Sequence, residues 1–317
     1  MSAPWAMPGT GPAQPSTSST HEDEAATSQP DVGTTDDHLD PPLPPPPVPL
    51  RPMTIPDLLD GSFAILKRRP RDVLTLSAAF VVPIQLLSAI LLRDVLGAGG
   101  FMGTGVGDPT TTVGFEDSGE VTGLGATMTS ALIALASLAL LTGALAAMVA
   151  DWYDGVRRPP WTLIKVTMRR APALIVGVVV VHVLEFVGLV GVVIGAYILM
   201  GMLQLVSPII VAESVGPFRA VRRSMQLTGS KFWRSMGVPA LVGLIGAIVG
   251  FGFQLIPELV TIVVSDDWNW LIRSSGATLA QLVAAPFTAG VAVLYHLDLR
   301  ARSEGYDISR RVHERSR

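Results

Sequence analysis

A stretch of forty residues, 173–212, limits what this chain can fold into more than any other part of it. Its only acidic or basic side chains are His182 and Glu185. The hydrocarbon core of a bilayer is about 30 Å thick, and ~20 helical residues cross it. Forty apolar residues therefore predict two membrane crossings joined by a tight, glycine-containing turn. The basic segment 213–234 follows, as expected on the cytosolic side of a membrane hairpin.

The composition of the whole chain agrees with an integral membrane protein, because 49% of the residues are hydrophobic and only 15% are charged. The chain has no cysteine, which excludes disulfides, thiolate catalysis and Cys-ligated metals. No basic region followed by an apolar run stands at the N-terminus, so we expect no cleaved signal peptide.

The hydropathy pattern divides the chain into three parts. Residues 1–50 are acidic and rich in Pro, Ser and Thr, and they bury too little apolar surface to offset the entropy of ordering. We expect a disordered cytosolic tail that ends in a proline-rich, polyproline II stalk. Residues 51–300 are expected to form an all-α integral membrane domain with six transmembrane helices, and residues 301–317 a basic cytosolic tail. The expected helices are about 73–92, 128–150, 173–190, 193–212, 236–256 and 276–297.

The six helices are expected to form three hairpins, each preceded by a basic amphipathic helix that lies in the membrane interface. The clearest example is 54–69, where Thr54 can cap the helix and Lys67, Arg68 and Arg69 end it. Similar starts, such as Asp57-Leu-Leu-Asp-Gly61 and Asp151-Trp-Tyr-Asp-Gly155, indicate a threefold internal repeat.

Six crossings place both termini on one side of the membrane, and the basic residues indicate which side. With these crossings, 21 of the 23 Lys and Arg residues lie in the inner segments, and the outer loops keep only Arg93 and Arg273. Basic residues are enriched in cytosolic loops, so both termini are expected in the cytosol. Arg outnumbers Lys by twenty to three, which is typical of a GC-rich bacterial genome. We therefore expect a multi-pass protein of the bacterial cytoplasmic membrane.

Several motifs of the membrane domain resemble a known bacterial family. They are Arg51-Pro-Met-Thr-Ile55, Pro208-Ile-Ile-Val-Ala-Glu213, Ala220-Val-Arg-Arg-Ser224, Lys231-Phe-Trp-Arg234 and Leu294-Tyr-His-Leu-Asp298-Leu-Arg300. They are similar to the six-helix membrane family labelled glycerophosphoryl diester phosphodiesterase membrane domain. The likeness covers about residues 51–308, with departures at Met225 and His296. It implies the six-helix fold and no catalytic residue, since the function of that family is not established.

The family label does not predict a phosphodiesterase here. Such an enzyme carries a TIM barrel of typically ~250 residues, and only seventeen residues follow Arg300. The sequence also contains no GxSxG or HExxH motif. We expect no enzyme, no cofactor and no metal site.

His182 and Glu185 are the most informative polar residues, because ionisable groups inside a bilayer are costly and usually face the bundle interior. Their spacing of three places them on one helix face. They could form a proton or cation relay or a polar site for a lipid headgroup. The alternative is a structural hydrogen bond that ties helices together.

Glutamines and glycines are the other intramembrane candidates. One amide lies in each of four crossings, at Gln85, Gln204, Gln254 and Gln281. They could line a polar path, although interhelical hydrogen bonds are the commoner role. Gly246 and Gly250 have GxxxG spacing and are expected to pack closely against a neighbouring helix.

The inner basic clusters have two interpretations. Topology alone requires them, and they would also attract anionic lipid headgroups by about 1 kcal/mol per basic residue. The best candidate surface for headgroups or for a protein partner consists of Arg222, Arg223, Lys231 and Arg234. Nucleic acid is a poor alternative partner, because the clusters already lie at the membrane.

Two hypotheses for function follow. The first is a non-catalytic scaffold, accessory subunit or lipid-interacting component of the bacterial cell envelope, with membrane lipids and an envelope protein as partners. The second is a small transporter or lipid carrier that uses His182 and Glu185. A continuous polar cavity joining Glu185 to the glutamines would favour transport, and a dry, packed interior would favour a scaffold.

Overall fold

The structure is a computed structural model that describes residues 46, 48, 51–91, 118–191, 193–264 and 268–305. All elements in these ranges are α-helices. They are α1 Ile55–Arg68, α2 Pro70–Leu91, α4 Ser118–Tyr153, α5 Pro160–Gly191, α6 Val193–Leu203, α7 Val206–Ala212, α8 Pro217–Gly229, α9 Phe232–Thr261 and α10 Asn269–Glu304. Most of the expected N-terminal tail and of the C-terminal tail lies outside the described residues.

Six helical stretches are long and apolar enough to cross a membrane, which confirms the predicted number. They are Pro70–Ile90, Ala131–Tyr153, Pro160–Gly188, Gly195–Ala212, Phe232–Thr261 and Asn269–Glu304. Each contains most or all of one expected crossing, and several are longer than expected. The chain is therefore a multi-pass, all-helical membrane protein.

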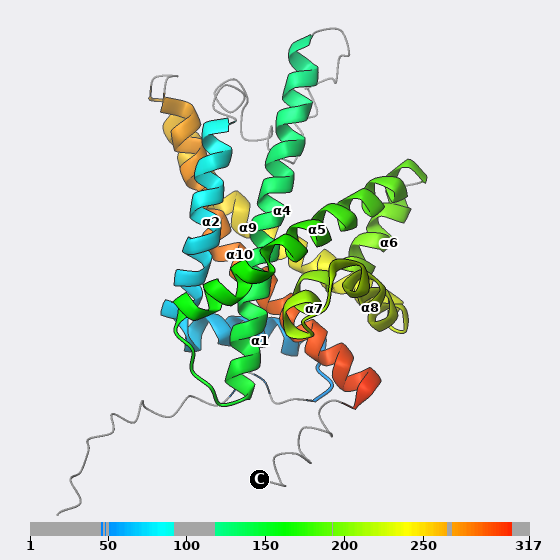
Figure 1. The fold of residues 1–317 in the computed structure, drawn as a ribbon. Helices are drawn as coiled ribbons and strands as arrows, with labels where there is room; N and C mark the ends of the chain where they lie inside the picture. Colours follow the sequence, from blue (N-terminus) through cyan, green and yellow to red (C-terminus); the bar gives the residue numbers. More distant parts are fainter. Residues whose placement is uncertain are drawn as a thin grey trace, which may run out of the picture. The chain divides into compact units, whose positions relative to one another are not determined.

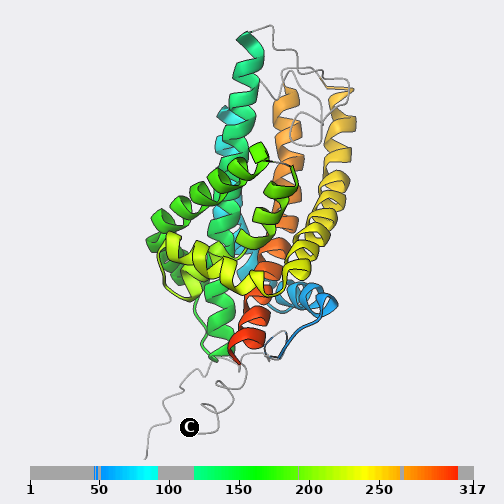
Figure 2. The same ribbon diagram turned by 90° about the vertical axis from the view of Figure 1, so that its right-hand side faces the viewer.

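Helices α4 and α10 form the centre of the helical bundle. In an apolar 18-residue stretch of each helix, 61% of the residues are buried in α4 and 50% in α10, against 17% in α5 and in α9. Helix α10 packs against α9, α2, α4 and α1, while α4 also packs against α5 and α7. Figure 2 shows α9 and α10 side by side, while α6 packs against both α5 and α9.

Helices α5 and α9 present apolar side chains outward. Phe186 on α5 is 66% exposed and Ile256 on α9 is 70% exposed. An extended apolar surface of this kind marks contact with a membrane. These two helices therefore supply much of the lipid-facing side of the bundle.

Helix α1 is short and lies near the end of the bundle where α10 finishes (Figure 1). A reciprocal cap starts it: the Thr54 hydroxyl accepts from the Asp57 N–H at 3.3 Å, and the Asp57 carboxylate accepts from the Thr54 N–H at 2.8 Å. Hydrogen bonding of the Asp57 carboxylate by the backbone N–H and the side chain of Thr54 holds the pKa of this carboxyl below its ordinary value. The buried face of α1 includes Leu58 and Ile65, while Ser62 donates to the Phe287 carbonyl at 2.8 Å.

The amphipathic helix expected before the second hairpin is not separate. Helix α5 runs from Pro160 to Gly191 with Pro172 inside it. Lys165 and Arg169 therefore lie on the first part of the same helix that carries His182. The sequence could not show that α5 continues through Pro172. A proline can stand at a helix boundary, or inside a helix that lacks one hydrogen bond.

The single helix expected over 193–212 is divided into α6 and α7. Pro208 has no N–H to bond the carbonyl of Gln204, and its ring crowds that carbonyl, so the helix breaks there. The side-chain amide of Gln204 lies at the break. Its Nε2 donates to the Gly201 carbonyl at 2.8 Å and to the Ser235 carbonyl of α9 at 3.1 Å.

The close packing expected at Gly246 and Gly250 is wrong. A Cβ added at either position would meet no atom within 4 Å among the described residues. The close approach of α9 to α6 occurs instead at Gly201, where an added Cβ would collide with Met236.

Contacts with the helices begin earlier than the expected domain boundary at residue 50. The Arg68 guanidinium donates to the Pro46 carbonyl at 3.0 Å. The Tyr153 hydroxyl donates to the Val48 carbonyl, and the Val48 side chain is buried against Gly61 and Leu294.

Candidate functional site

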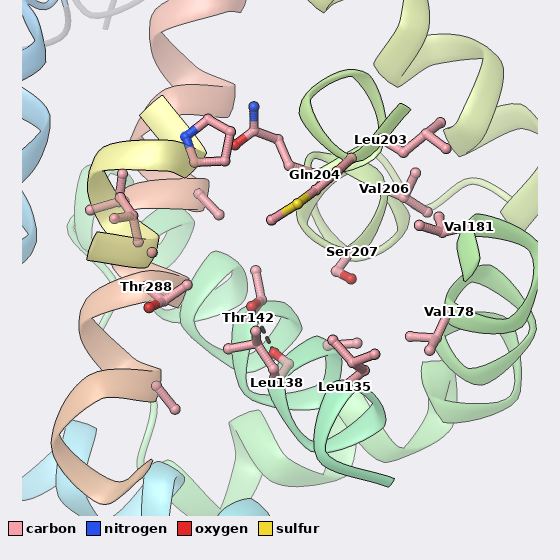
Figure 3. Close-up of a pocket in the computed structure, with 18 of the residues that line it drawn as sticks. Leu135, Leu138, Thr142, Val178, Val181, Leu203, Gln204, Val206, Ser207 and Thr288 are labelled. Carbon is pink, nitrogen blue, oxygen red and sulfur yellow. Dashed lines mark hydrogen bonds between the residues drawn. The ribbon is translucent and has the colours of Figure 1, made fainter. Parts of the chain in front are cut away.

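A cavity of about 610 Å³ lies among α4, α5, α6, α7, α9 and α10, at the depth of the membrane spans. Figure 3 shows side chains of these helices lining it from different sides. Most of the wall is aliphatic. Its apolar and glycine residues include Leu135, Leu138, Val178, Val181, Leu203, Val206, Val242, Gly243, Gly246 and Val291. The volume is in the range of small-molecule sites in proteins, roughly 300–1,000 Å³.

His182 and Glu185 face this cavity together. Nδ1 of His182 lies 2.6 Å from Oε2 of Glu185, as the spacing of three along α5 predicts. About a quarter of the His182 side chain and a fifth of the Glu185 side chain stay accessible. The pair therefore satisfies part of its own hydrogen bonding and still presents polar atoms to the cavity.

The four glutamines separate into different roles. Gln204 lines the cavity, but its amide nitrogen is held by the Gly201 carbonyl of α6 and the Ser235 carbonyl of α9. Gln281 of α10 also lines the cavity, is exposed, and has no hydrogen-bond partner among the described residues. Gln85 of α2 and Gln254 of α9 do not line it. Two of the four predicted glutamines, Gln204 and Gln281, thus line the same cavity as Glu185.

Three hydroxyl side chains complete the polar part of the wall. Thr142 of α4 donates to the Leu138 carbonyl of its own helix at 2.7 Å. Ser207 of α7 and Thr288 of α10 have no hydrogen-bond partner within the described part of the chain, and Figure 3 shows them on different sides of the cavity. No Lys or Arg is among the described residues that line the cavity. Its only ionisable side chains are therefore His182 and Glu185.

A second polar arrangement, which we call the Asp298 clamp, lies where α10 nears its end. Asp298 is fully buried and accepts from the Met53 N–H at 2.6 Å and from Nε of Arg302 at 2.9 Å. Nη2 of Arg234 lies 3.0 Å from its other oxygen. Both arginines also donate to the Met53 carbonyl, at 2.8 and 2.6 Å. The backbone N–H and carbonyl of Met53, just before α1, are thereby fixed to α9 and α10.

A third arrangement, the Glu213 cluster, joins α7, α8 and α10. The Glu213 carboxylate lies 3.2 Å from Nε2 of His296 and 3.2 Å from Nε of Arg223. Arg223 also pairs with Glu304, which pairs with Arg300 at 3.1 Å. Burial acts to raise the pKa of Glu213, but the hydrogen bond from His296 and the nearby positive charges outweigh it, so this pKa is below its ordinary value.

The predicted headgroup surface is thereby divided. Arg223 and Arg234 turn inward to buried or half-buried acids, in the Glu213 cluster and the Asp298 clamp. Arg222 and Lys231 are exposed and have no partner among the described residues. The exposed Trp233 lies close to them in sequence.

The sequence singled out none of the acids at the centre of these two arrangements. Glu213, His296 and Asp298 appear only inside motifs that carry the family resemblance. One signal was available: His296, Arg300 and Glu304 recur every fourth residue, and so do Asp298 and Arg302, which places each set on one side of α10.

No group of three or more His, Asp and Glu side chains that could hold a metal ion occurs within the described ranges. A scan against protein-family models, a search of curated proteins and a search of solved structures each found no match.

Proposed function

We propose that this chain is a non-catalytic, lipid-interacting component of the bacterial cell envelope, and that it binds an amphipathic lipid in the cavity beside α5. The cavity is the observation that carries the proposal. It lies at membrane depth, most of its wall is aliphatic, and a few polar groups converge on it at His182, Glu185 and Gln281. An aliphatic wall with a few placed polar groups is the usual form of a small-molecule site.

A purely structural scaffold accounts for this interior less well. Membrane helices gain stability from close packing and interhelical hydrogen bonds. A cavity of about 610 Å³ forfeits such packing. The unpartnered Gln281 amide and the Ser207 and Thr288 hydroxyls add polar groups that a bilayer cannot satisfy. A bound amphiphile would supply both kinds of contact.

The experiment compares two glycine variants of α9. Gly246 lines the cavity and Gly250 does not, and both have open space around an added Cβ. Gly246→Leu should therefore fill part of the cavity, while Gly250→Leu is a matched control with the same gain in helix propensity. The full chain, extracted in mild detergent, is analysed for co-purifying lipid by quantitative mass spectrometry.

We expect lipid at near-stoichiometric amounts with the wild type and Gly250→Leu, and about tenfold less with Gly246→Leu. Equal lipid content in both variants would contradict binding in the cavity. A stoichiometric envelope protein without retained lipid would favour the accessory-subunit hypothesis instead.

A lipid carrier or small transporter is the second candidate, and the break between α6 and α7 favours it. Discontinuous helices at membrane depth form substrate sites in several transporter folds, and Gln204 places this break on the cavity wall. Flux through liposomes that Glu185→Ala abolishes and Gln254→Ala retains would support the carrier. Absence of flux from a protein that retains lipid would leave binding as the function.

The arrangement in the membrane belongs to the same proposal. We propose three helical hairpins with α1 and α8 as basic helices in the cytosolic interface, and both termini in the cytosol of a bacterial cell. Exposed Phe218 and Trp233, with exposed Arg222 and Lys231, support contact between α8 and anionic headgroups. Membership of the glycerophosphoryl diester phosphodiesterase membrane domain family, without catalytic activity, remains part of this proposal and rests on the motifs quoted above.

A further inference from the structure

The charges around the cavity indicate what kind of headgroup it accepts. Among the described residues that line it, Glu185 and His182 are the only ionisable ones, and their side chains contact each other. No basic side chain among the described lining residues could neutralise an anionic ligand. Placing a phosphate next to Glu185 in a medium of low dielectric would bury an unpaired charge.

The hydrogen-bonding groups narrow the choice further. The Gln281 amide carries two N–H donors and one acceptor, and Ser207 and Thr288 each both donate and accept. A quaternary or primary ammonium has no acceptor, so it would leave the donors of Gln281 unsatisfied. Hydroxyl groups both donate, to Glu185, and accept, from Gln281.

We propose that the cavity takes an amphiphile with an uncharged, hydroxyl-bearing headgroup and discriminates against the corresponding phosphate-bearing lipid. This inference rests on the proposed function and names the class of its ligand. The hydroxyls lie against Glu185 and Gln281, and the apolar chains lie along the Val and Leu side chains of α4 and α5. Because the cavity is only partly enclosed, chains longer than it can continue into the bilayer. Anionic lipids bind outside the cavity, at exposed basic side chains such as Arg222 and Lys231.

The test uses two photoactivatable lipids that carry the same diazirine acyl chain, a diacylglycerol and a phosphatidylglycerol. Both headgroups bear hydroxyls, but the phosphatidylglycerol adds a charged phosphate and a second glycerol. Each is incorporated at low mole fraction into phosphatidylcholine nanodiscs that contain the full chain. After irradiation and proteolysis, mass spectrometry measures labelling of the cavity-lining segments Leu135–Thr142 and Gln281–Ala292.

We expect the diacylglycerol to label these segments about tenfold more than the phosphatidylglycerol. Glu185→Gln keeps an acceptor and removes the charge, so it should reduce that preference. Gln281→Leu should lower diacylglycerol labelling about fivefold by removing the amide. Gln254→Leu, on a membrane helix outside the cavity, should leave it unchanged.

The outcomes separate the two proposals. If both lipids label the cavity segments equally, or phosphatidylglycerol labels them more, the inference about the headgroup is overturned while lipid binding stands. If neither lipid labels them above the level seen with Gly246→Leu, the cavity does not bind lipid and both proposals fall.

Discussion

Asp298 shows how one buried carboxylate can connect parts of the chain that are far apart in sequence. It bonds the N–H of Met53, 245 residues away, and it lies between Arg234 and Arg302. Its Oδ1 accepts from the Met53 N–H and from Arg302, whereas the buried Oδ2 has only the ion-pair contact with Arg234 at 3.0 Å and no hydrogen bond among the described residues. Without the charge of Asp298, the guanidinium groups of Arg234 and Arg302 would both lie at the Met53 carbonyl with no acid between them.

Asp298→Asn should therefore destabilise the protein, by about 3 kcal/mol, as breaking buried ion pairs usually does. The measurement is the thermal unfolding midpoint of the purified protein in detergent. Asp60→Asn is the control, because Asp60 is exposed on α1 and has no partner among the described residues. Equal midpoints for the two variants would show that the clamp contributes no stability.

Glu213 predicts a pH dependence whose sign follows from its lowered pKa. The folded protein holds this carboxyl in its ionised form more strongly than the unfolded chain does, for which the ordinary value is near 4.5. The resulting stability is fully present above pH 4.5 and is lost as the pH falls through the lower, folded pKa. His296, Arg223 and Arg300 supply the stabilising contacts.

Comparison with Glu213→Gln isolates this contribution, since the variant cannot ionise at that position. The wild type should unfold at a higher temperature than the variant at pH 6 to 7, and the difference should shrink as the pH is lowered below about 4.5. A difference that stays constant over this range would mean that ionisation of Glu213 does not contribute.

At the scale of single residues, the sequence predicted contacts within one helix and missed contacts between helices. The hydrogen bond between His182 and Glu185 follows from their spacing, because residues three apart share a helix face. The partners of Asp298 and Glu213 depend on how α1, α8 and α9 lie against α10, which no local pattern states. For the same reason Arg223 and Arg234 could not be told from the exposed Arg222.

Among the helices, the break between α6 and α7 makes a testable distinction between two glutamines. Gln204 donates to the Gly201 carbonyl of α6 and to the Ser235 carbonyl of α9, whereas Gln281 faces the cavity without a described partner. Gln204→Leu should lower the unfolding free energy by about 1 kcal/mol, the usual scale of a hydrogen bond between membrane helices. Gln281→Leu should leave it unchanged or raise it, because it removes an unpaired polar group from an apolar wall.

Unfolding in mixed micelles with increasing denaturing detergent measures both variants against the wild type. Equal loss of stability in the two would mean that Gln281 also has a structural partner, and the assignment of Gln281 to the ligand would fail with it.

The number of membrane helices was predictable because hydropathy over about twenty residues is a local, compositional signal. The ends and breaks of these helices were less predictable from the sequence. Pro172 stands just before the expected helix 173–190 and yet lies inside α5, whereas Pro208 stands inside the expected helix 193–212 and lies at a break. Likewise, GxxxG spacing at Gly246 and Gly250 indicates that a close approach is possible, but the neighbouring helix must be there to use it. Here the open side of Gly246 forms the cavity wall instead.

Over the described part of the chain, the buried ion pairs and the exposed basic side chains gather where α2, α5 and α9 begin and where α4 and α10 end. Arg69 stacks on Trp152, Arg158 pairs with Asp151, and the Asp298 clamp and Glu213 cluster lie among the same helix ends. At the other end, the described residues form an ion pair between Arg273 and Glu258. This asymmetry is what the positive-inside rule expects of a protein whose charged end faces the cytosol.

Labelling of single cysteines tests this orientation without background, because the natural chain has none. Gln226→Cys on α8 and Val263→Cys after α9 are both at exposed positions near opposite ends of the bundle. In intact spheroplasts, a membrane-impermeant maleimide should modify Val263→Cys and leave Gln226→Cys unmodified, and lysis should expose both. The reverse pattern would place the basic end and both termini outside. It would also remove α8 from the anionic cytosolic leaflet, so Arg222 and Lys231 would lose their proposed lipid partner. The cavity lies within the bilayer and would keep its proposed lipid in either orientation.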